Sequence, residues 1–202
     1  MQRLKAQREP ARGFTLLELL MVVLIISVLI GILVPTVSQA RTTARRAACG
    51  EQLRGLGVGV QAYLSENNFV LPISAQMPSV NTTREPLPKT LEREVPAPKS
   101  WRCPGDVNSY FRIDGQTFDT YFAGETLSYE YNMSLGGRKV ERWFLHSLLG
   151  DAGTFVLADF DSFHNANKAA DNAKNLLYAD GHVAGLEDIM LKVGGATPTT
   201  RP

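Results

Sequence analysis

The sequence predicts an α+β fold, in which one long N-terminal helix packs on a small domain built around an antiparallel sheet. A continuous apolar run occupies residues 14–34, and an amphipathic helical pattern continues over residues 35–65. Short strand-like runs separated by Gly, Asn and Asp follow within residues 66–193, which we expect to form the globular domain. We expect residues 194–202 to be a disordered tail.

The average composition hides an uneven distribution of charge and apolar residues. The chain has 202 residues, of which 44% are hydrophobic, and a formal net charge of +1. The first 13 residues hold four cations and one anion, whereas the rest holds 17 cations and 19 anions, a net charge of −2. The part after residue 34 has no polybasic stripe, which argues against a nucleic-acid-binding protein. Two cysteines are too few for a disulfide scaffold or a cysteine zinc site.

The apolar run has the length of a membrane-spanning helix. It reads FTLLELLMVVLIISVLIGILV, with 17 apolar residues among 21, and a helix of that length spans roughly 31 Å. A buried core helix is rarely so long without a polar face, and a cleaved secretory signal has a shorter apolar region ending in an A-x-A-like site. We therefore predict a single span, with the basic N-terminus in the cytoplasm and the following domain exported.

Glu18 is the only charged residue between Phe14 and Ala40, and a carboxylate inside an apolar span is costly. One interpretation is an interfacial Glu near the helix start, where the helix dipole favours negative charge. The other is that Glu18 binds a cation. Because this segment holds none, processing of the chain or another molecule must supply it.

Residues Gly13 to Glu18, GFTLLE, together with the basic leader, the apolar span and Pro35, resemble the prepilin signature of type IV pilins and type II secretion pseudopilins. The resemblance implies a pilin-like fold. It also implies that a prepilin peptidase cuts between Gly13 and Phe14 and methylates the new amine. The Phe14 ammonium would then meet the Glu18 carboxylate of a neighbouring subunit, where pairing fixes register in a low-dielectric bundle.

The resemblance implies a structural subunit, a prepilin or pseudopilin, and not an enzyme or a cofactor-dependent protein. Its partners would be the prepilin peptidase, other copies or related subunits, and an inner-membrane assembly platform. It would reside in the inner membrane and then in a pilus or pseudopilus. None of the motifs G-x-S-x-G, G-x-x-x-x-G-K-[ST] and H-E-x-x-H occurs in the sequence. Two alternatives stay open: a minor or tip subunit acting as a binding module, and an unprocessed membrane-anchored domain.

Glycines and prolines interrupt the pattern after the span. Pro35 should kink the helix. Gly55, Gly57 and Gly59 each weaken it by up to about 1 kcal/mol relative to Ala, so they mark a bend or a close approach of a neighbour. Residues 70–104 contain seven of the eleven prolines, which predicts a long loop with a short helical piece near Leu87–Glu94.

The two cysteines lie far apart in the chain, Cys49 in the helical segment and Cys103 in the long loop. In an exported domain a disulfide between them can persist. Two buried free thiols are the alternative, because spacing in the sequence does not determine geometry.

The sequence after the long loop predicts short strands and one helix. Lys139–Leu149 is typical of a helix, and the Asp180-Gly181 pair signals a hairpin turn. The strand-like runs carry aromatic and branched residues between turn-forming residues. They are Phe118–Phe122, Leu127–Met133, Thr154–Ala158 and Asn175–Val183.

Several pieces of the exported part carry a second resemblance. They are Cys49 with Leu53-Arg54 and Leu56-Gly57, Trp101-Arg102-Cys103-Pro104, Leu127-Ser128-Tyr129 and Tyr178-Ala179-Asp180-Gly181-His182-Val183. They resemble a pilin-like family with a C-terminal His…Asp-Gly processing-associated motif. Nine residues usually separate that His from Asp-Gly, whereas 15 residues lie between His164 and Asp180, and position 170 is Ala.

Acidic and amide residues cluster near the C-terminal end of the domain. Oxygen-rich clusters suit calcium, and major pseudopilins carry a calcium site in their C-terminal loops, so Asp159, Asp161 and Asp180 are candidate calcium ligands. The EF-hand pattern fails, because Phe and His occupy its fifth and sixth positions. A transition-metal site at His164 and His182, or simply solvated turns, are the alternatives.

Overall fold

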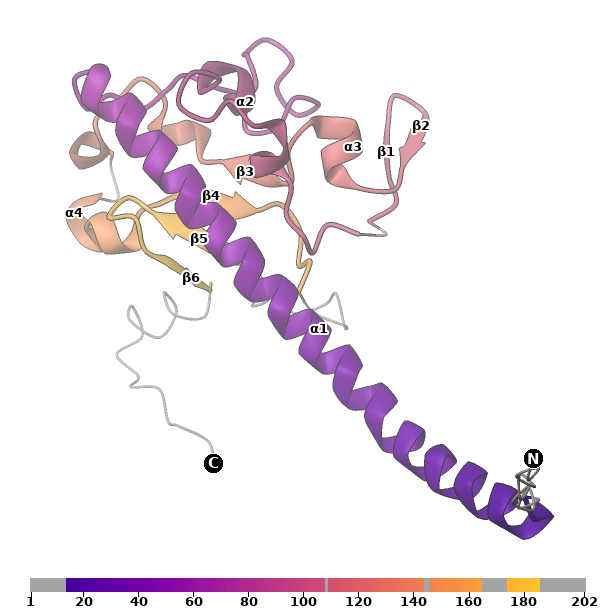
Figure 1. Ribbon diagram of the computed structural model, residues 1–202. Coiled ribbons are helices and arrows are strands. Elements are labelled where there is room, and N and C mark those ends of the chain that lie inside the picture. Colours follow the sequence, from indigo (N-terminus) through magenta and orange to yellow (C-terminus); the bar gives the residue numbers. More distant parts are fainter. Residues whose placement is uncertain (1–13, 108, 144–145, 165–173, 186–202) are drawn as a thin grey trace, which may run out of the picture. The chain divides into compact units, whose positions relative to one another are not determined.

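The computed structural model describes residues 14–107, 109–143, 146–164 and 174–185 (Figure 1). The chain divides into two compact units, residues 1–41 and residues 42–202. Helix α1 (Leu16–Glu66) begins in the first unit and continues into the second. This confirms that the apolar run and the amphipathic segment form one helix. The leader at residues 1–13 and the tail at residues 194–202 lie outside the described residues.

The first part of α1 is apolar all round, and every side chain from Phe14 to Arg41 is exposed. Pro35 lies inside the helix, where it has no N–H to donate. Hydroxyl groups in this segment bond to helix carbonyls: Ser27 donates to the Val23 carbonyl at 2.7 Å, and Thr36 donates to the Leu33 carbonyl at 2.8 Å. Because these hydroxyl groups already have hydrogen-bond acceptors within the helix, they do not need water as a partner and are compatible with a non-aqueous surrounding.

The second part of α1 is amphipathic and contributes one face to the core. Its buried residues recur at helical spacing and are Cys49, Leu53, Leu56, Gly57, Gly59, Val60 and Leu64. A Cβ on Gly57 would lie 2.9 Å from Leu177 Cδ1, and one on Gly59 would lie 2.3 Å from Val95 Cγ2. Both glycines therefore mark close approaches of neighbours, whereas a Cβ on Gly55 would meet nothing within 4 Å.

A four-stranded antiparallel sheet lies against this part of α1 (Figure 1). Its order is β3 (Tyr129–Tyr131), β4 (Phe155–Asp159), β5 (Asn175–Tyr178) and β6 (Val183–Gly185), each strand pairing with the next. The predicted hairpin is confirmed, because Leu177 pairs with Val183 around the turn that contains Gly181 at φ +88°. Three of the predicted strand regions thus contain β3, β5 and all but the last residue of β4, whereas β6 shares only Val183 with the predicted region Asn175–Val183.

The prediction of a strand over Phe118–Phe122 is wrong beyond its first residue. A separate hairpin joins β1 (Phe111–Ile113) to β2 (Gln116–Phe118). The chain then enters helix α3 (Tyr121–Glu125), because the Thr120 side chain caps it by accepting a hydrogen bond from the Ala123 N–H.

The predicted helix over Lys139–Leu149 is broken into two pieces. The structure has a 3₁₀ turn, η3 (Val140–Arg142), and a short helix, α4 (His146–Leu149). Trp143 between them takes an extended backbone (φ −73°, ψ 136°), and its side chain is buried in the core. Burial of this large side chain requires an extended backbone at Trp143, and this requirement outweighs the helical periodicity of the surrounding residues. Two further 3₁₀ turns are η2 (Met133–Leu135) and η4 (Asp151–Gly153).

The proline-rich segment is a loop, as predicted, and the core holds it in place. Its helical piece is shorter than Leu87–Glu94, because α2 (Leu87–Thr90) ends where Leu91 turns into the core. A 3₁₀ turn, η1 (Pro98–Trp101), precedes Cys103, and the Trp101 carbonyl accepts a hydrogen bond from the Ser128 N–H at 2.8 Å. Buried residues along this loop include Leu71, Ser74, Ala75, Met77, Leu87, Leu91, Trp101 and Cys103.

Candidate functional site

Glu18 caps the first turn of α1. Its Oε2 accepts hydrogen bonds from the Thr15 N–H and the Thr15 hydroxyl, both at 2.9 Å, while the Glu18 N–H donates to the Thr15 hydroxyl oxygen at 3.2 Å. This reciprocal arrangement is a capping box, in which side chains satisfy N–H groups that have no partner in the helix. The carboxylate is thereby held at the positive end of the helix dipole.

The segment that follows is suited to a non-aqueous surrounding. In the part of the chain that the structure describes, α1 is the one helix long and apolar enough to cross a membrane. Large apolar side chains are exposed along its whole first part, among them Phe14, Leu16 and Leu17, each more than 70% exposed. An apolar surface of this size is unfavourable in water, so we expect lipid or other apolar helices to surround it.

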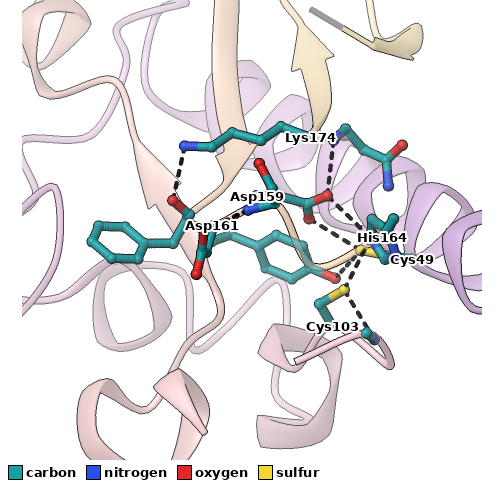
Figure 2. Close-up of polar contacts among 11 residues, drawn as sticks. Cys49, Cys103, Asp159, Asp161, His164 and Lys174 are labelled. Carbon is teal, nitrogen blue, oxygen red and sulfur yellow. Dashed lines mark hydrogen bonds and ion pairs between the residues drawn. The ribbon is translucent and has the colours of Figure 1, made fainter. Parts of the chain in front are cut away.

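A second candidate site lies inside the globular unit. Cys49 on α1, Cys103 after η1, Asp159 at the end of β4 and His164 in the following turn point toward one another (Figure 2). Their ligand atoms all lie within 4.8 Å of one another, and all four residues are buried. We call these four residues the buried cluster. They come from segments up to 115 positions apart in the sequence, so only the tertiary fold assembles them.

Three contacts connect the residues of the buried cluster, and a fourth joins it to the neighbouring backbone. The Cys49 thiol donates to Asp159 Oδ1 at 3.1 Å, and His164 Nε2 lies 3.2 Å from Asp159 Oδ2. Cys103 Sγ lies 3.5 Å from the same His164 nitrogen. Cys103 Sγ also accepts a hydrogen bond from the Gly105 N–H at 3.3 Å. Nε2 of His164 is therefore directed at the centre of the cluster.

Burial and hydrogen bonding shift the pKa values within this cluster. The neighbouring Cys103 thiol, burial and Asp159 raise the pKa of Cys49 far above its ordinary value, so this sulfur is a thiol. Burial lowers the pKa of His164, but its hydrogen bonds to Asp159 and Cys49 outweigh that effect and raise the pKa to about 9. His164 thus faces the Asp159 carboxylate as a buried hydrogen-bonding partner.

Neighbouring backbone groups fix the positions of these side chains. Asp159 Oδ2 accepts a hydrogen bond from the Asn175 N–H at 2.8 Å, across the β4–β5 pair. Gly105 packs on the His164 ring, since a Cβ there would lie 2.5 Å from His164 Cε1. The Tyr129 hydroxyl lies 3.5 Å from Cys49 Sγ.

The loop carrying Cys103 is held by a further buried carboxylate, Asp106. Its two oxygens accept hydrogen bonds from the Tyr121 and Phe122 N–H groups and from the hydroxyls of Ser109 and Ser128, at distances of 2.7–3.1 Å. This carboxylate ties the loop to the start of α3 and to the residue before β3.

Comparison with protein families matches residues 10–34 to the prokaryotic N-terminal methylation motif. The chain fits a type IV pilin-like protein. The motif covers the end of the basic leader and the apolar segment, and it leads directly into the long helix described above. Comparisons with curated protein sequences and with solved structures gave no significant match.

The described residues for which the sequence predicts a role in processing or assembly lie at the start of α1. Phe14 and Thr15 precede the helix, and Glu18 lies in its first turn. Gly13 lies outside the described residues. Cys49 and Cys103 meet in the buried cluster as free thiols, so of the two alternatives the structure has the thiol form.

The three candidate calcium ligands of the pilin-like chain have different partners. Asp159 belongs to the buried cluster, next to two sulfur atoms. Asp161 accepts a hydrogen bond from the Ser162 N–H, at the start of the next turn. Asp180 caps the β5–β6 hairpin by accepting from the His182 N–H, and its carboxylate lies 2.5 Å from His182 Nδ1. His182 stacks on Tyr178, away from the contacts of His164.

Sequence reasoning missed two features of the pilin-like chain. The capping box has a sequence signal, the Thr-x-x-Glu pattern of residues 15–18, which precedes an apolar run. The buried cluster has no local signal, because its two cysteines and its His-Asp pair belong to separate segments. The sequence analysis considered Cys49 and Cys103 as a pair, and Asp159 and His164 as candidate ligands of different metals, but it did not bring the four residues together.

Proposed function

We propose that this chain is a structural subunit of a pilin-type filament, either a type IV pilus or a type II secretion pseudopilus. A prepilin peptidase removes residues 1–13 and methylates Phe14. The apolar part of α1 first anchors the subunit in the inner membrane, with the globular domain exported, and then packs against α1 helices of other subunits. The role is mechanical and requires no catalytic residue.

One observation carries this proposal: the methylation motif over residues 10–34 leads directly into an exposed apolar helix whose only charge up to Ala40 is Glu18. A lone membrane helix would need only apolar residues. A carboxylate in its first turn makes sense where a cation arrives from outside the segment.

Processing supplies such a cation. Cleavage after Gly13 leaves an α-ammonium on Phe14, and N-methylation keeps its positive charge. Within the chain, the Thr15 hydrogen bonds both end on Glu18 Oε2. We infer that the other carboxylate oxygen, Oε1, receives the Phe14 ammonium of a neighbouring subunit and so sets the axial step between subunits.

Mass spectrometry of the mature N-terminus tests the processing step. Full-length protein expressed in a host with a prepilin peptidase should begin at N-methyl-Phe14. A Gly13→Leu variant, which places a bulky side chain at the cut, should keep residues 1–13. An intact Met1 on the wild-type chain would contradict the proposal and would favour an unprocessed membrane-anchored domain.

Filament preparations test the assembly step. Filaments sheared from cells should contain the processed chain as an abundant component, and the Gly13→Leu chain should stay in the membrane fraction. A processed chain present only in trace amounts would instead support the alternative of a minor or tip subunit. Capture of a ligand by the full-length protein would then be the property to measure.

A further inference from the structure

We propose that Cys49, Cys103, Asp159 and His164 form a structural zinc site that fastens the exported half of α1 to the globular domain. This inference does not depend on the proposed function, because it rests on residues outside the methylation motif.

The geometry of the buried cluster matches a tetrahedral ion. Zinc bonds to sulfur at about 2.3 Å and to nitrogen or oxygen at about 2.0 Å, so its four ligand atoms lie roughly 3.3–3.8 Å apart. Three contacts have lengths near this range: Cys49 Sγ lies 3.1 Å from Asp159 Oδ1, His164 Nε2 lies 3.2 Å from Asp159 Oδ2, and Cys103 Sγ lies 3.5 Å from His164 Nε2. All four ligand atoms lie within 4.8 Å of one another, so small shifts suffice to surround one ion.

The types of ligand atom in the buried cluster favour zinc over calcium. Two thiolates, one imidazole nitrogen and one carboxylate oxygen suit zinc, whereas calcium requires six to eight oxygen ligands. Four protein ligands also complete a tetrahedron and leave no open position for water or a substrate. Burial agrees with this, because the side chains of Asp159 and His164 have 0% exposure and both cysteines have 0% exposure. The site is therefore structural and closed.

The surrounding groups are those that support metal ligands. The Gly105 N–H already donates to Cys103 Sγ, a bond that favours a thiolate at this position. The Asn175 N–H orients the Asp159 carboxylate, and Gly105 holds the plane of the His164 ring. Binding of Zn²⁺ to these four side chains releases the protons of both thiols and the Nε2 proton of His164 to solvent, and no oxidation is involved.

The location explains what the ion would do. Cys49 is the first buried residue of α1, at the end of its core face, and the other three ligands lie in the loop after η1 and around the end of β4. One ion would thus join the helix, the proline-rich loop and the sheet.

Metal analysis of the full-length chain tests the proposal. The protein, purified in detergent without chelator and without a polyhistidine tag, should contain about one zinc per chain. Cys49→Ser, Cys103→Ser and His164→Ala should each lose it. Tyr131→Phe is the matched control: Tyr131 is a buried residue of β3 whose hydroxyl donates to the Pro72 carbonyl, so the variant loses a buried hydrogen bond but should keep its zinc.

Cobalt provides a spectroscopic readout of the ligand set, and its first measurement requires only the wild-type chain. Wild-type protein stripped of metal and reloaded with Co²⁺ should show the visible bands of a tetrahedral ion and a near-ultraviolet sulfur-to-cobalt band. The sulfur-to-cobalt band should fall by about half in any single cysteine variant that still binds, since one of two thiolates is lost.

Two results would overturn the proposal. One is a wild-type chain that takes up neither zinc nor cobalt when each metal ion is supplied alone. The other is a Cys49–Cys103 disulfide in the native protein, seen as a mass two hydrogens below that of the dithiol and as resistance to alkylation before reduction. Zinc retained by both cysteine variants would overturn the ligand set as well.

Discussion

Thr15 and Glu18 hold each other at the start of α1: the carboxylate accepts from the Thr15 N–H and hydroxyl, and the Thr15 hydroxyl oxygen accepts from the Glu18 N–H. The residue expected to pair with a neighbouring subunit therefore also caps its own helix. The two roles use different properties of Glu18, since a cap needs an oxygen acceptor and an ion pair needs a charge.

Glu18→Gln separates these roles. Glutamine also serves at this position of a capping box, so α1 should begin at the same residue, but the negative charge is lost. We expect normal leader cleavage and at least a tenfold loss of sheared filaments. Immunoblots of the membrane and filament fractions measure both.

Thr15→Ala is the converse control. It removes the capping hydroxyl and keeps the carboxylate, so filament yield should stay near that of the wild type. If Glu18→Gln assembles normally while Thr15→Ala does not, the cap and not the charge is what assembly requires.

The three glycines of α1 should differ in their response to alanine. Gly55→Ala should stabilise the chain by up to about 1 kcal/mol, since the new Cβ meets nothing within 4 Å and alanine favours the helix. Gly59→Ala should destabilise it by roughly 1–3 kcal/mol, because Val95 Cγ2 would lie 2.3 Å from the new Cβ. Gly57→Ala should fall between them, since Leu177 presents the end of a longer side chain.

Denaturant unfolding in detergent, followed by fluorescence of the buried Trp101 and Trp143, measures this series. Equal effects of the three substitutions would mean that helix propensity alone governs this segment and that the close approach to Val95 is not a packing constraint.

Asp106→Ala should be among the most destabilising single substitutions in the domain. It leaves the N–H groups of Tyr121 and Phe122 without their shared acceptor and removes the partner of two hydroxyls. Each buried group without a partner costs about 1–3 kcal/mol, so we expect a loss of about 3 kcal/mol or more. The same fluorescence-detected unfolding measures it.

Asp119→Asn is the charge-matched control for Asp106, because it also removes one negative charge near α3 but from an exposed residue. It should change the unfolding free energy little. A comparable loss in both variants would attribute the effect of Asp106 to net charge and not to its buried hydrogen bonds.

Gly105→Ala probes the packing of the buried cluster. The new Cβ would lie 2.5 Å from His164 Cε1 and 2.8 Å from Nδ1, so the ring has to move away from Cys103. We expect a loss of stability of roughly 1–3 kcal/mol. Gly50→Ala is the control, since its Cβ would meet only Val183, at an ordinary contact distance of 3.8 Å.

Short sequence patterns correctly predicted those elements whose conformation depends on neighbouring residues in the chain. The hairpin at Asp180-Gly181 was predictable because a tight turn with positive φ requires such residues. The same signal at Asp114-Gly115 marks the β1–β2 hairpin, which the strand prediction at Phe118–Phe122 missed. The helix predicted over Lys139–Leu149 failed because burial of Trp143 imposes an extended backbone that periodicity does not reveal.

The sequence by itself determined the N-terminal segment of this protein: the basic first residues, the methylation motif, and the apolar first part of α1 with its single carboxylate, Glu18. These features are local, and their physics depends on the order of residues along one helix. The tertiary structure alone decided that Cys49, Cys103, Asp159 and His164 meet. Their proximity results from packing α1 and a proline-rich loop against the end of β4, and such long-range contacts leave no periodic trace in the chain.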